Sequence, residues 1–278
     1  MRIRYSFSSR KTGTIEGGNA HRIAFPKIVS DLVKLSDIIL EVIDARFPDK
    51  TRNIELEQLV ALKKKKLVYI YNKIDIADKR VVEQYIQDKQ TFPYVLTSCS
   101  KRAGSRQVRQ RIKIEAKRLK LNRSVQVAVI GYPNTGKSSL INFLIGRSST
   151  LVSQQSGFTK GIQKLKMSTG IFLMDSPGVI PNDEDSTSNH EDLKKHAEIG
   201  VRTYDKVKDP EFVVARLVRE HPNVFDKYFK IAAKGDSEKL LEFVGKKNYF
   251  LKKGGVVDTS RAARYVIKLW QNGDINQK

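Results

Sequence analysis

The chain has 278 residues, of which 40% are hydrophobic, and its 52 lysines and arginines against 30 aspartates and glutamates give a net charge of +22. At about 150 residues per domain, this length predicts two domains, and the apolar content excludes a globally disordered chain. No run approaches the ~20 apolar residues of a membrane helix, the first 22 residues lack the apolar run of a signal peptide, and the single cysteine, Cys99, excludes an intrachain disulfide. We therefore expect a cytoplasmic protein with no membrane partner.

Apolar periodicity predicts helices that alternate with strands over the first part of the chain. The predicted helices are 22–35, 53–62, 79–89, 104–120 and 137–145, and the predicted strands are 38–43, 67–71, 94–97 and 125–130. Residues 162–167 and 171–174 then predict a hairpin around Gly170. This alternation indicates an α/β fold with a largely parallel sheet.

The pattern changes after Pro177. Residues 182–190 are polar and predict a loop. Helical patterns follow at 192–205, 211–220, 236–247 and 259–271. We therefore predict an α/β domain over residues 1–185 and a small all-helical domain over residues 186–278.

Positive charge is concentrated between residues 101 and 123, where ten basic side chains accompany one acidic residue, Glu115. The ten are Lys101, Arg102, Arg106, Arg109, Arg111, Lys113, Lys117, Arg118, Lys120 and Arg123. Lys63 to Lys66 form a second run. Such an excess attracts polyanions and releases their counterions on binding, which indicates nucleic acid as a partner. For any single residue, a solvated helix face is an equally weighted alternative.

The segment from Gly131 to Ser138 (GYPNTGKS) has the phosphate-binding P-loop pattern GxxxxGK[ST]. An apolar strand precedes it and a helix follows it, which is the context that the pattern requires. Backbone N–H groups of such a loop form an anion site at a helix N-terminus. We expect Lys137 to reach the β- and γ-phosphates and the Ser138 hydroxyl to bind Mg²⁺.

Two later motifs complete a phosphate and metal site. Asp175-Ser176-Pro177-Gly178 follows a predicted strand, and a carboxylate at a strand end can hold Mg²⁺ while the glycine amide senses the γ-phosphate. Thr159 lies between this motif and the P-loop, and its hydroxyl is the candidate second ligand of Mg²⁺ and γ-phosphate sensor. A loop threonine without a role is the alternative reading of Thr159.

Two earlier motifs predict recognition of guanine. Asn72-Lys73-Ile74-Asp75 follows an apolar strand, and an aspartate there can accept from guanine N1–H and the 2-amino group, a pair that adenine lacks. The lysine stem would cover the base. Ser98-Cys99-Ser100 follows the next strand and would supply a backbone N–H to guanine O6. The base motifs and the P-loop, each at a strand's carboxyl end, predict a shared site.

The order of these motifs is unusual, because an ordinary GTPase places its phosphate motifs first. Here the base motifs come before the P-loop, and Asp175–Gly178 comes last. A parallel sheet tolerates such a permutation when the original termini lie close together. One consequence is that the segment after Gly178 runs directly into the helical domain, so nucleotide state can reposition that domain.

Asp44-Ala45-Arg46, NKID, GYPNTGKSS, GFTKG and DSPG, in this order, resemble the circularly permuted GTPases of ribosome assembly, the YlqF type with nucleolar relatives such as nucleostemin. The resemblance extends from about residue 20 to the end. It implies a Ras-like permuted P-loop GTPase domain, a helical domain that contacts ribosomal RNA, and the large ribosomal subunit as partner. Residues 245–257 also resemble a glycine-containing segment of that family. We expect a monomer when the protein is free.

The resemblance also implies site residues. The catalytic candidates are Lys137, Thr159, Gly178 and His21, and the candidates for Mg²⁺ are Ser138, Thr159 and Asp175. Asn134 matches an asparagine of potassium-stimulated relatives. The predicted nucleotide-binding residues are Asn72, Lys73, Asp75, Ser98, Cys99, Ser100, Tyr132, Pro133, Asn134, Thr135, Gly136, Lys137, Ser138, Ser139, Thr159, Asp175 and Gly178.

The sequence leaves more than one interpretation of which residues catalyse hydrolysis. Val179 stands where many GTPases carry a glutamine that orients the attacking water, so we expect weak intrinsic hydrolysis that a partner stimulates. His21 lies at the family histidine's distance upstream of Asp44, but its flanking residues differ, so an ordinary surface histidine is an equally weighted reading.

The leading hypothesis is a GTPase that times docking and release of an assembly factor on the large ribosomal subunit. The alternative is an RNA-binding GTP/GDP switch with negligible catalysis. An ATP-dependent enzyme conflicts with the NKID segment at 72–75.

Overall fold

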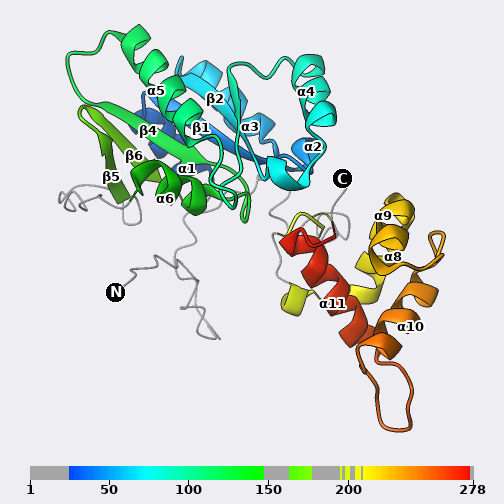
Figure 1. The fold of residues 1–278 in the computed structure, drawn as a ribbon. Coiled ribbons are helices and arrows are strands. Elements are labelled where there is room, and N and C mark those ends of the chain that lie inside the picture. The colour runs from blue at the N-terminus through cyan, green and yellow to red at the C-terminus, as the bar shows by residue number, and fades with distance from the viewer. Residues whose placement is uncertain are drawn as a thin grey trace, which may run out of the picture.

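A six-stranded sheet forms the centre of the first part of the chain (Figure 1). The computed structural model describes residues 25–146, 163–176, 195, 198–200, 204–207 and 209–275. The strand order is β3-β2-β1-β4-β6-β5, and only the β5–β6 pair is antiparallel among these strands. The strands are β1 (Ile38–Asp44), β2 (Lys66–Asn72), β3 (Tyr94–Leu96), β4 (Val125–Ile130), β5 (Gln163–Ser168) and β6 (Ile171–Asp175).

Helices cover both faces of this sheet, which explains why its central strands are apolar on both sides. One face packs on α5 and α6, and the other packs on α1, α3 and α4. Side-chain caps begin two of these helices, because Asn53 and Asp78 accept hydrogen bonds from the first turns of α3 and α4. The helices are α1 (Phe25–Leu35), α2 (Pro48–Thr51), α3 (Ile54–Leu62), α4 (Lys79–Asp88), α5 (Ser105–Leu119) and α6 (Lys137–Ile145), with the 3-10 turn η1 (Ile74–Ile76).

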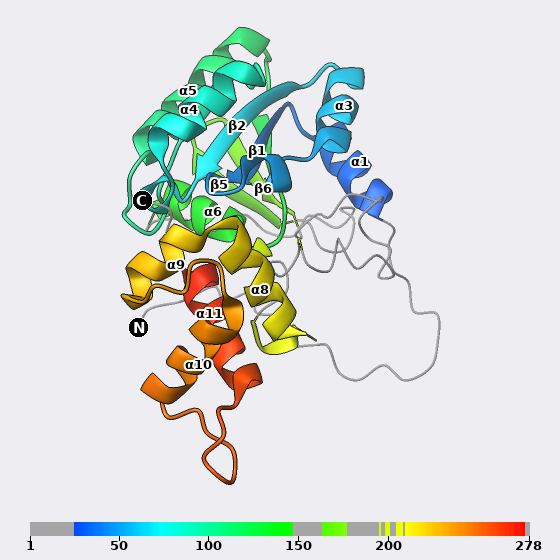
Figure 2. The same ribbon diagram turned by 90° about the vertical axis from the view of Figure 1, so that its right-hand side faces the viewer.

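The later helices form a separate bundle beside the α/β body (Figures 1 and 2). Its elements are η4 (Tyr204–Lys206), α8 (Pro210–Glu220), α9 (Pro222–Phe229), α10 (Ser237–Lys247) and α11 (Thr259–Asn272). Trp270 lies at the centre of the bundle, 2% exposed, and stacks on Phe225 with ring centroids 5.5 Å apart. Two side chains of the α/β body, Phe47 and Tyr132, belong to the same apolar cluster. The bundle and the body therefore share part of one core.

The expected α/β architecture with a largely parallel sheet is confirmed. The strands and helices of the first part lie within a few residues of the predicted ranges. The short helix α2 was not predicted, since four residues are too few to show a period, and α9 was likewise missed. Most of the predicted helix 192–205 and the predicted domain boundary at residue 185 lie outside the described residues, so that boundary stays a prediction. Within the described part of the chain, no helix is long and apolar enough to span a membrane.

Candidate functional site

The sequence motifs meet at the carboxyl edge of the sheet, between β1 and β4. From β1 the chain builds outward to β2 and β3, and from β4 it builds the other way to β6, so the strand order reverses between them. In open α/β sheets, ligands bind at such a switch point. The P-loop follows β4 there, and Asp44 ends β1 beside it.

The P-loop approaches the base-recognition loop so closely that only glycine fits at one position. Gly136 has φ +102°, and a Cβ there would collide with the side-chain amide of Asn72. Gly136 also immediately precedes the first residue of α6, so the loop ends at a helix N-terminus. Ser138 and Ser139 in the first turn are exposed, whereas Thr135 is buried and donates to the carbonyl of Tyr132 at 2.9 Å.

Lys137 is folded back onto its own loop and donates from Nζ to the carbonyl of Tyr132 at 2.6 Å. Burial lowers the pKa of Lys137 to about 8, and the nearby Asp175 carboxylate opposes this shift. Burial also raises the pKa of Asp175, against the opposing effects of Lys137 and of the Ser176 N–H. The two side chains therefore share one poorly solvated space, at the start of α6 and the end of β6.

Asp175 passes a simple test for a metal ligand. Its Oδ1 atom is buried and has no hydrogen-bond partner among the described residues. A buried carboxylate oxygen without a donor is costly unless a cation or a ligand complements it. Asp175 and the exposed hydroxyl of Ser138 are oxygen donors of the kind that Mg²⁺ takes alongside substrate phosphates.

Asn72 joins the base motifs to the P-loop. Its Nδ2 donates to the carbonyl of Thr135 at 2.9 Å. Its Oδ1 accepts from the backbone N–H of Cys99 and from the Thr97 hydroxyl, both at 3.2 Å. Asn72 is 2% exposed, so all three loops are held by one buried amide.

Lys73 is held by the acidic side chain at the end of β1. Its Nζ donates to Asp44 Oδ2 at 2.7 Å, and the Arg46 guanidinium contacts both oxygens of the same carboxylate. Burial by itself would raise the pKa of Asp44, but Arg46 and Lys73 outweigh it and lower that pKa to about 2. Arg46 also donates from Nη1 to the carbonyl of Trp270 at 3.0 Å, which ties this cluster to the helical bundle.

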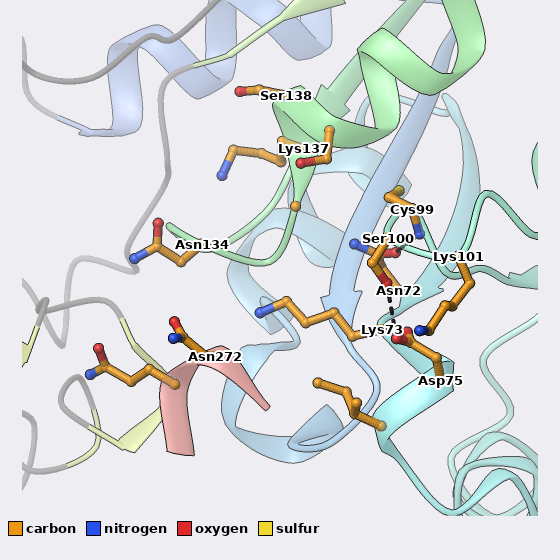
Figure 3. A pocket seen from close by; sticks show the side chains of 14 residues that line it. Asn72, Lys73, Asp75, Cys99, Ser100, Lys101, Asn134, Lys137, Ser138 and Asn272 are labelled. Atoms are coloured by element: carbon orange, nitrogen blue, oxygen red, sulfur yellow. Dashed lines mark hydrogen bonds between the residues drawn. The ribbon is translucent and has the colours of Figure 1, made fainter. Parts of the chain in front are cut away.

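A pocket of about 760 Å³ opens between these motifs (Figure 3). Asp75 lines it and accepts a hydrogen bond from the Ser100 hydroxyl at 2.9 Å. Ser98 supports this turn, since its Oγ accepts from the backbone N–H of Lys101 at 3.1 Å. The lining residues are Asn72, Lys73, Asp75, Ile76, Cys99, Ser100, Lys101, Asn134, Gly136, Lys137, Ser138, Ser139, Gln271 and Asn272. Its volume is within the range of ligand-binding pockets.

The bundle contributes to this pocket in a way that the sequence did not predict. Gln271 and Asn272, at the end of α11, line it opposite the P-loop. Gly273 follows with φ +83°, and a Cβ there would meet the Ile76 side chain. The Asn134 side chain in turn donates to the carbonyl of Gly200. No motif marks Gln271 or Asn272, so only the packing reveals them.

The structure brings together the base motifs, the P-loop, Lys137 and Asp175. Thr159, Gly178 and His21 lie outside the described residues, as does Val179. Pro133 is half-buried in the P-loop, and Tyr132 is buried against the bundle.

Comparison with known proteins finds similarity to GTP-binding proteins. A family model described as "50S ribosome-binding GTPase" matches residues 126–231, beginning at β4, which leads into the P-loop. An uncharacterized GTP-binding protein of Methanocaldococcus jannaschii is 35% identical over 92% of this chain and 67% of its own length. Ribosome biogenesis GTPase A of Thermotoga maritima is 30% identical over 84% of this chain and 81% of its own.

The Methanocaldococcus protein and other relatives are longer than this chain. It spans 55% of the nuclear GTP-binding protein NUG1 of Saccharomyces cerevisiae, with 30% identity. Among solved structures, GNP-bound YlqF from T. maritima superposes with a TM-score of 0.62 and 25% identity, covering 90% of this chain and 94% of that one. The permuted Ras-like fold that the family resemblance implies is thereby confirmed. The chain therefore belongs to the circularly permuted GTPases whose members include ribosome biogenesis GTPase A.

Proposed function

We propose that this chain binds GTP, hydrolyses it to GDP and phosphate, and acts as an assembly factor for the large ribosomal subunit. The observation that carries the nucleotide part is the Asn72 amide, which joins the P-loop to both base-recognition loops around one pocket. The ribosomal part rests on the relatives named for ribosome biogenesis and on the net charge of +22, which suits an RNA partner.

Each part of the pocket has a proposed role. Asp75 accepts from the guanine edge, with Lys73 along the base, and the Ser98–Ser100 turn supplies an N–H to O6. Lys137 and the P-loop amides, from Tyr132 through Ser139, hold the phosphates. Ser138, Thr159 and Asp175 hold Mg²⁺, which neutralises phosphate charge when bound. The buried Oδ1 of Asp175, which has no hydrogen-bond partner among the described residues, supports this assignment.

Hydrolysis by the isolated chain is expected to be slow. Val179 replaces the glutamine that orients water in many GTPases, and we propose that a ribosomal particle supplies or orders the missing element. Thr159, Gly178 and His21 stay candidates for this step. Asn134 stays a candidate for binding K⁺, which would add positive charge near the phosphates.

Nucleotide state is proposed to control docking through the helical bundle, which we take to be a domain beginning near residue 186. Tyr132 of the P-loop packs in the bundle core, and Gln271 and Asn272 face the nucleotide pocket. A change at the phosphates therefore has a short path to the surface that would contact ribosomal RNA. A cytoplasmic location and a monomeric free state stay predictions.

The test is steady-state GTP hydrolysis in Mg²⁺ and K⁺, alone and with purified large ribosomal subunits, with small subunits as the matched control. We expect a rate of about 10⁻⁴–10⁻³ s⁻¹ alone, as for an unassisted GTPase, and an increase of at least about tenfold with large subunits only. Repeating the assay in Na⁺ tests the potassium assignment.

Tight GTP binding with no stimulation would contradict the triggered enzyme. That result would favour the second candidate, an RNA-binding GTP/GDP switch with negligible turnover, which the valine at position 179 supports. Failure to bind GTP would contradict both.

A further inference from the structure

A second pocket, of about 410 Å³, lies at the amino-terminal ends of the strands, whereas the nucleotide pocket lies at their carboxyl ends. It is formed where β2 and β3 begin and where α5 ends, whereas the nucleotide motifs follow the carboxyl ends of the strands. Its lining residues are Lys66, Leu67, Phe92, Pro93, Tyr94, Arg111, Glu115 and Arg118. None of the GTPase-motif residues that the structure describes lines it.

Three cationic side chains border this pocket. Lys66 is exposed and makes no ion pair within the described residues. Arg111 and Arg118 share the carboxylate of Glu115, at 3.5 and 3.0 Å from Nη1 to Oε1. Glu115 is 3% exposed, so its buried carboxylate fixes the position of both guanidinium groups. Each guanidinium has five N–H donors, so donors remain for an anion.

An aromatic platform lies beside these cations. Phe92 is 45% exposed, and its ring contacts that of Tyr94, with centroids 5.7 Å apart and a tilt of 59°. Tyr94 is itself fixed by an edge-on contact with the buried Tyr71, at 6.4 Å. Phe92 is thus an exposed aromatic ring with a supporting contact, and it lines the same pocket as the fixed positive charge.

A supported aromatic face beside fixed cations is the combination that binds single-stranded nucleic acid, in which bases stack on rings and phosphates pair with lysine and arginine. We infer that this pocket binds one unstacked nucleotide of single-stranded RNA, with its base on Phe92 and a phosphate at Lys66 and Arg118. The inference rests on the proposed contact with ribosomal RNA and adds a position and a recognition mode to it.

The surroundings suit an RNA strand that continues past the pocket. The exposed Lys63 and Lys64 precede Lys66, whereas the exposed Lys113 and Lys117 lie on a different face of α5 from the two arginines. The one carboxylate in the lining is already paired with arginine. Binding is therefore expected to depend steeply on salt and little on base identity.

The test measures the affinity of the full chain, with GDP bound, for a fluorescein-labelled single-stranded RNA 12-mer of mixed sequence. Phe92→Leu keeps an apolar side chain but removes the ring face, and should weaken binding about fivefold or more. Phe92→Tyr should restore it. Arg118→Gln should weaken binding and reduce the slope of log affinity against log salt by about 0.7.

Phe212→Leu is the matched control, because Phe212 has a similar exposure, 53%, and lies beside Glu211 on α8. It should leave RNA affinity unchanged, and every variant should keep the wild-type affinity for GDP and the wild-type midpoint of thermal unfolding.

Two results would overturn the inference. If the wild type binds RNA and Phe92→Leu binds it equally well, the pocket is not a base site, although the proposed RNA contact survives. A loss in Arg118→Gln alone would then indicate a site for any polyanion. If the wild type binds neither this RNA nor large ribosomal subunits, the proposed function fails, and the inference fails with it.

Discussion

The side-chain amide of Asn72 donates to the carbonyl of Thr135 at 2.9 Å, and its oxygen accepts from the Cys99 N–H at 3.2 Å. One buried group therefore fixes the distance between the loop proposed to bind phosphate and the loops proposed to bind guanine. The permuted chain order separates these loops differently from an ordinary GTPase, but the parallel sheet restores their adjacency.

Replacing Asn72 with aspartate tests this bridge. The new carboxylate can still accept from Cys99, but it faces the Thr135 carbonyl without a donor, at a cost of about 1–3 kcal/mol. We expect GDP affinity to fall about tenfold, measured by fluorescence titration with a labelled GDP. Asn248→Asp is the matched control, because Asn248 Nδ2 also donates to a backbone carbonyl, that of Val244 at 2.8 Å, far from the pocket. Equal GDP affinities in the two variants would contradict the bridge.

Asp75 is the test of base identity. Asparagine at this position presents a donor to guanine N1–H and the 2-amino group, so GTP binding should weaken, whereas xanthosine triphosphate, with an oxo group at that edge, should bind better. The measurement is competition of GTP and xanthosine triphosphate for the same labelled nucleotide. Asp78→Asn, at the cap of α4, is the nearby control. Unchanged GTP affinity in Asp75→Asn would show that the base assignment is wrong.

Much of the fold follows from sequence because its signals are local. Runs such as Val125–Ile130 are apolar on both faces, and helices cover both faces of that strand. Capping residues such as Asn53 mark where helices begin. The short helix α2 was missed because four residues are too few to show a helical period, and α9 was missed as a separate helix because it follows α8 after His221 alone.

The site divides in the same way. Some site positions can be predicted from the sequence because the backbone geometry admits one residue type. Gly136 is an example, since a side chain there would collide with Asn72. The contribution of Gln271 and Asn272 to the pocket cannot be predicted from the sequence, because it arises from packing of the bundle on the α/β body. The prediction for residues 101–123 was only partly informative. Arg109 donates to the carbonyl of Leu144 at 2.7 Å, and Arg123 pairs with Asp37 at 2.7 Å, so these two cations have structural partners.

Nucleotide affinity should depend on pH through Lys137. Burial lowers its pKa in the free protein to about 8, so the side chain loses its charge as pH rises through 8. Phosphate favours the charged form, and GDP affinity should therefore fall by up to about tenfold per pH unit above pH 8. Folding stability changes in the opposite direction: the folded pKa lies below the ordinary 10.5, so stability of the free protein rises between pH 8 and 10.5.

Titration of GDP binding from pH 6.5 to 9.5 measures this dependence. Guanosine, which lacks phosphate, is the ligand control for ionisation of the base, and Lys137→Met is the protein control. The same pH dependence for GDP in Lys137→Met as in the wild type would contradict the assignment of the effect to this lysine.

Arg46 should be essential to the junction between the body and the bundle. It pairs with Asp44 at 2.8 Å and donates to the Trp270 carbonyl at 3.0 Å, with only 4% of its side chain exposed. Arg46→Gln keeps the backbone N–H that donates to Asp44 but leaves Lys73 as the one cation that contacts this carboxylate among the described residues. We therefore expect a loss of about 3 kcal/mol in the free energy of unfolding by urea. Lys246→Gln removes a surface pair with Glu242, at 2.5 Å, and should change it by less than about 1 kcal/mol. Similar losses in both variants would contradict a junction at Arg46.

The exposed cations of α5 give the last prediction. Arg106, Lys113 and Lys117 are exposed on this helix, whereas Arg111 and Arg118 are held by Glu115. Changing these three exposed residues to glutamate should weaken binding to ribosomal RNA at least about tenfold and flatten its salt dependence, because single-strand binding loses about 0.7 in slope per phosphate contact. The same change at Lys79, Arg80 and Lys89 on and after α4 alters net charge equally and is the control. A loss confined to the α5 variant places RNA on this face of the helix. Equal losses would reflect net charge alone, and no loss in either would leave the bundle and the pocket at Phe92 as the proposed contacts.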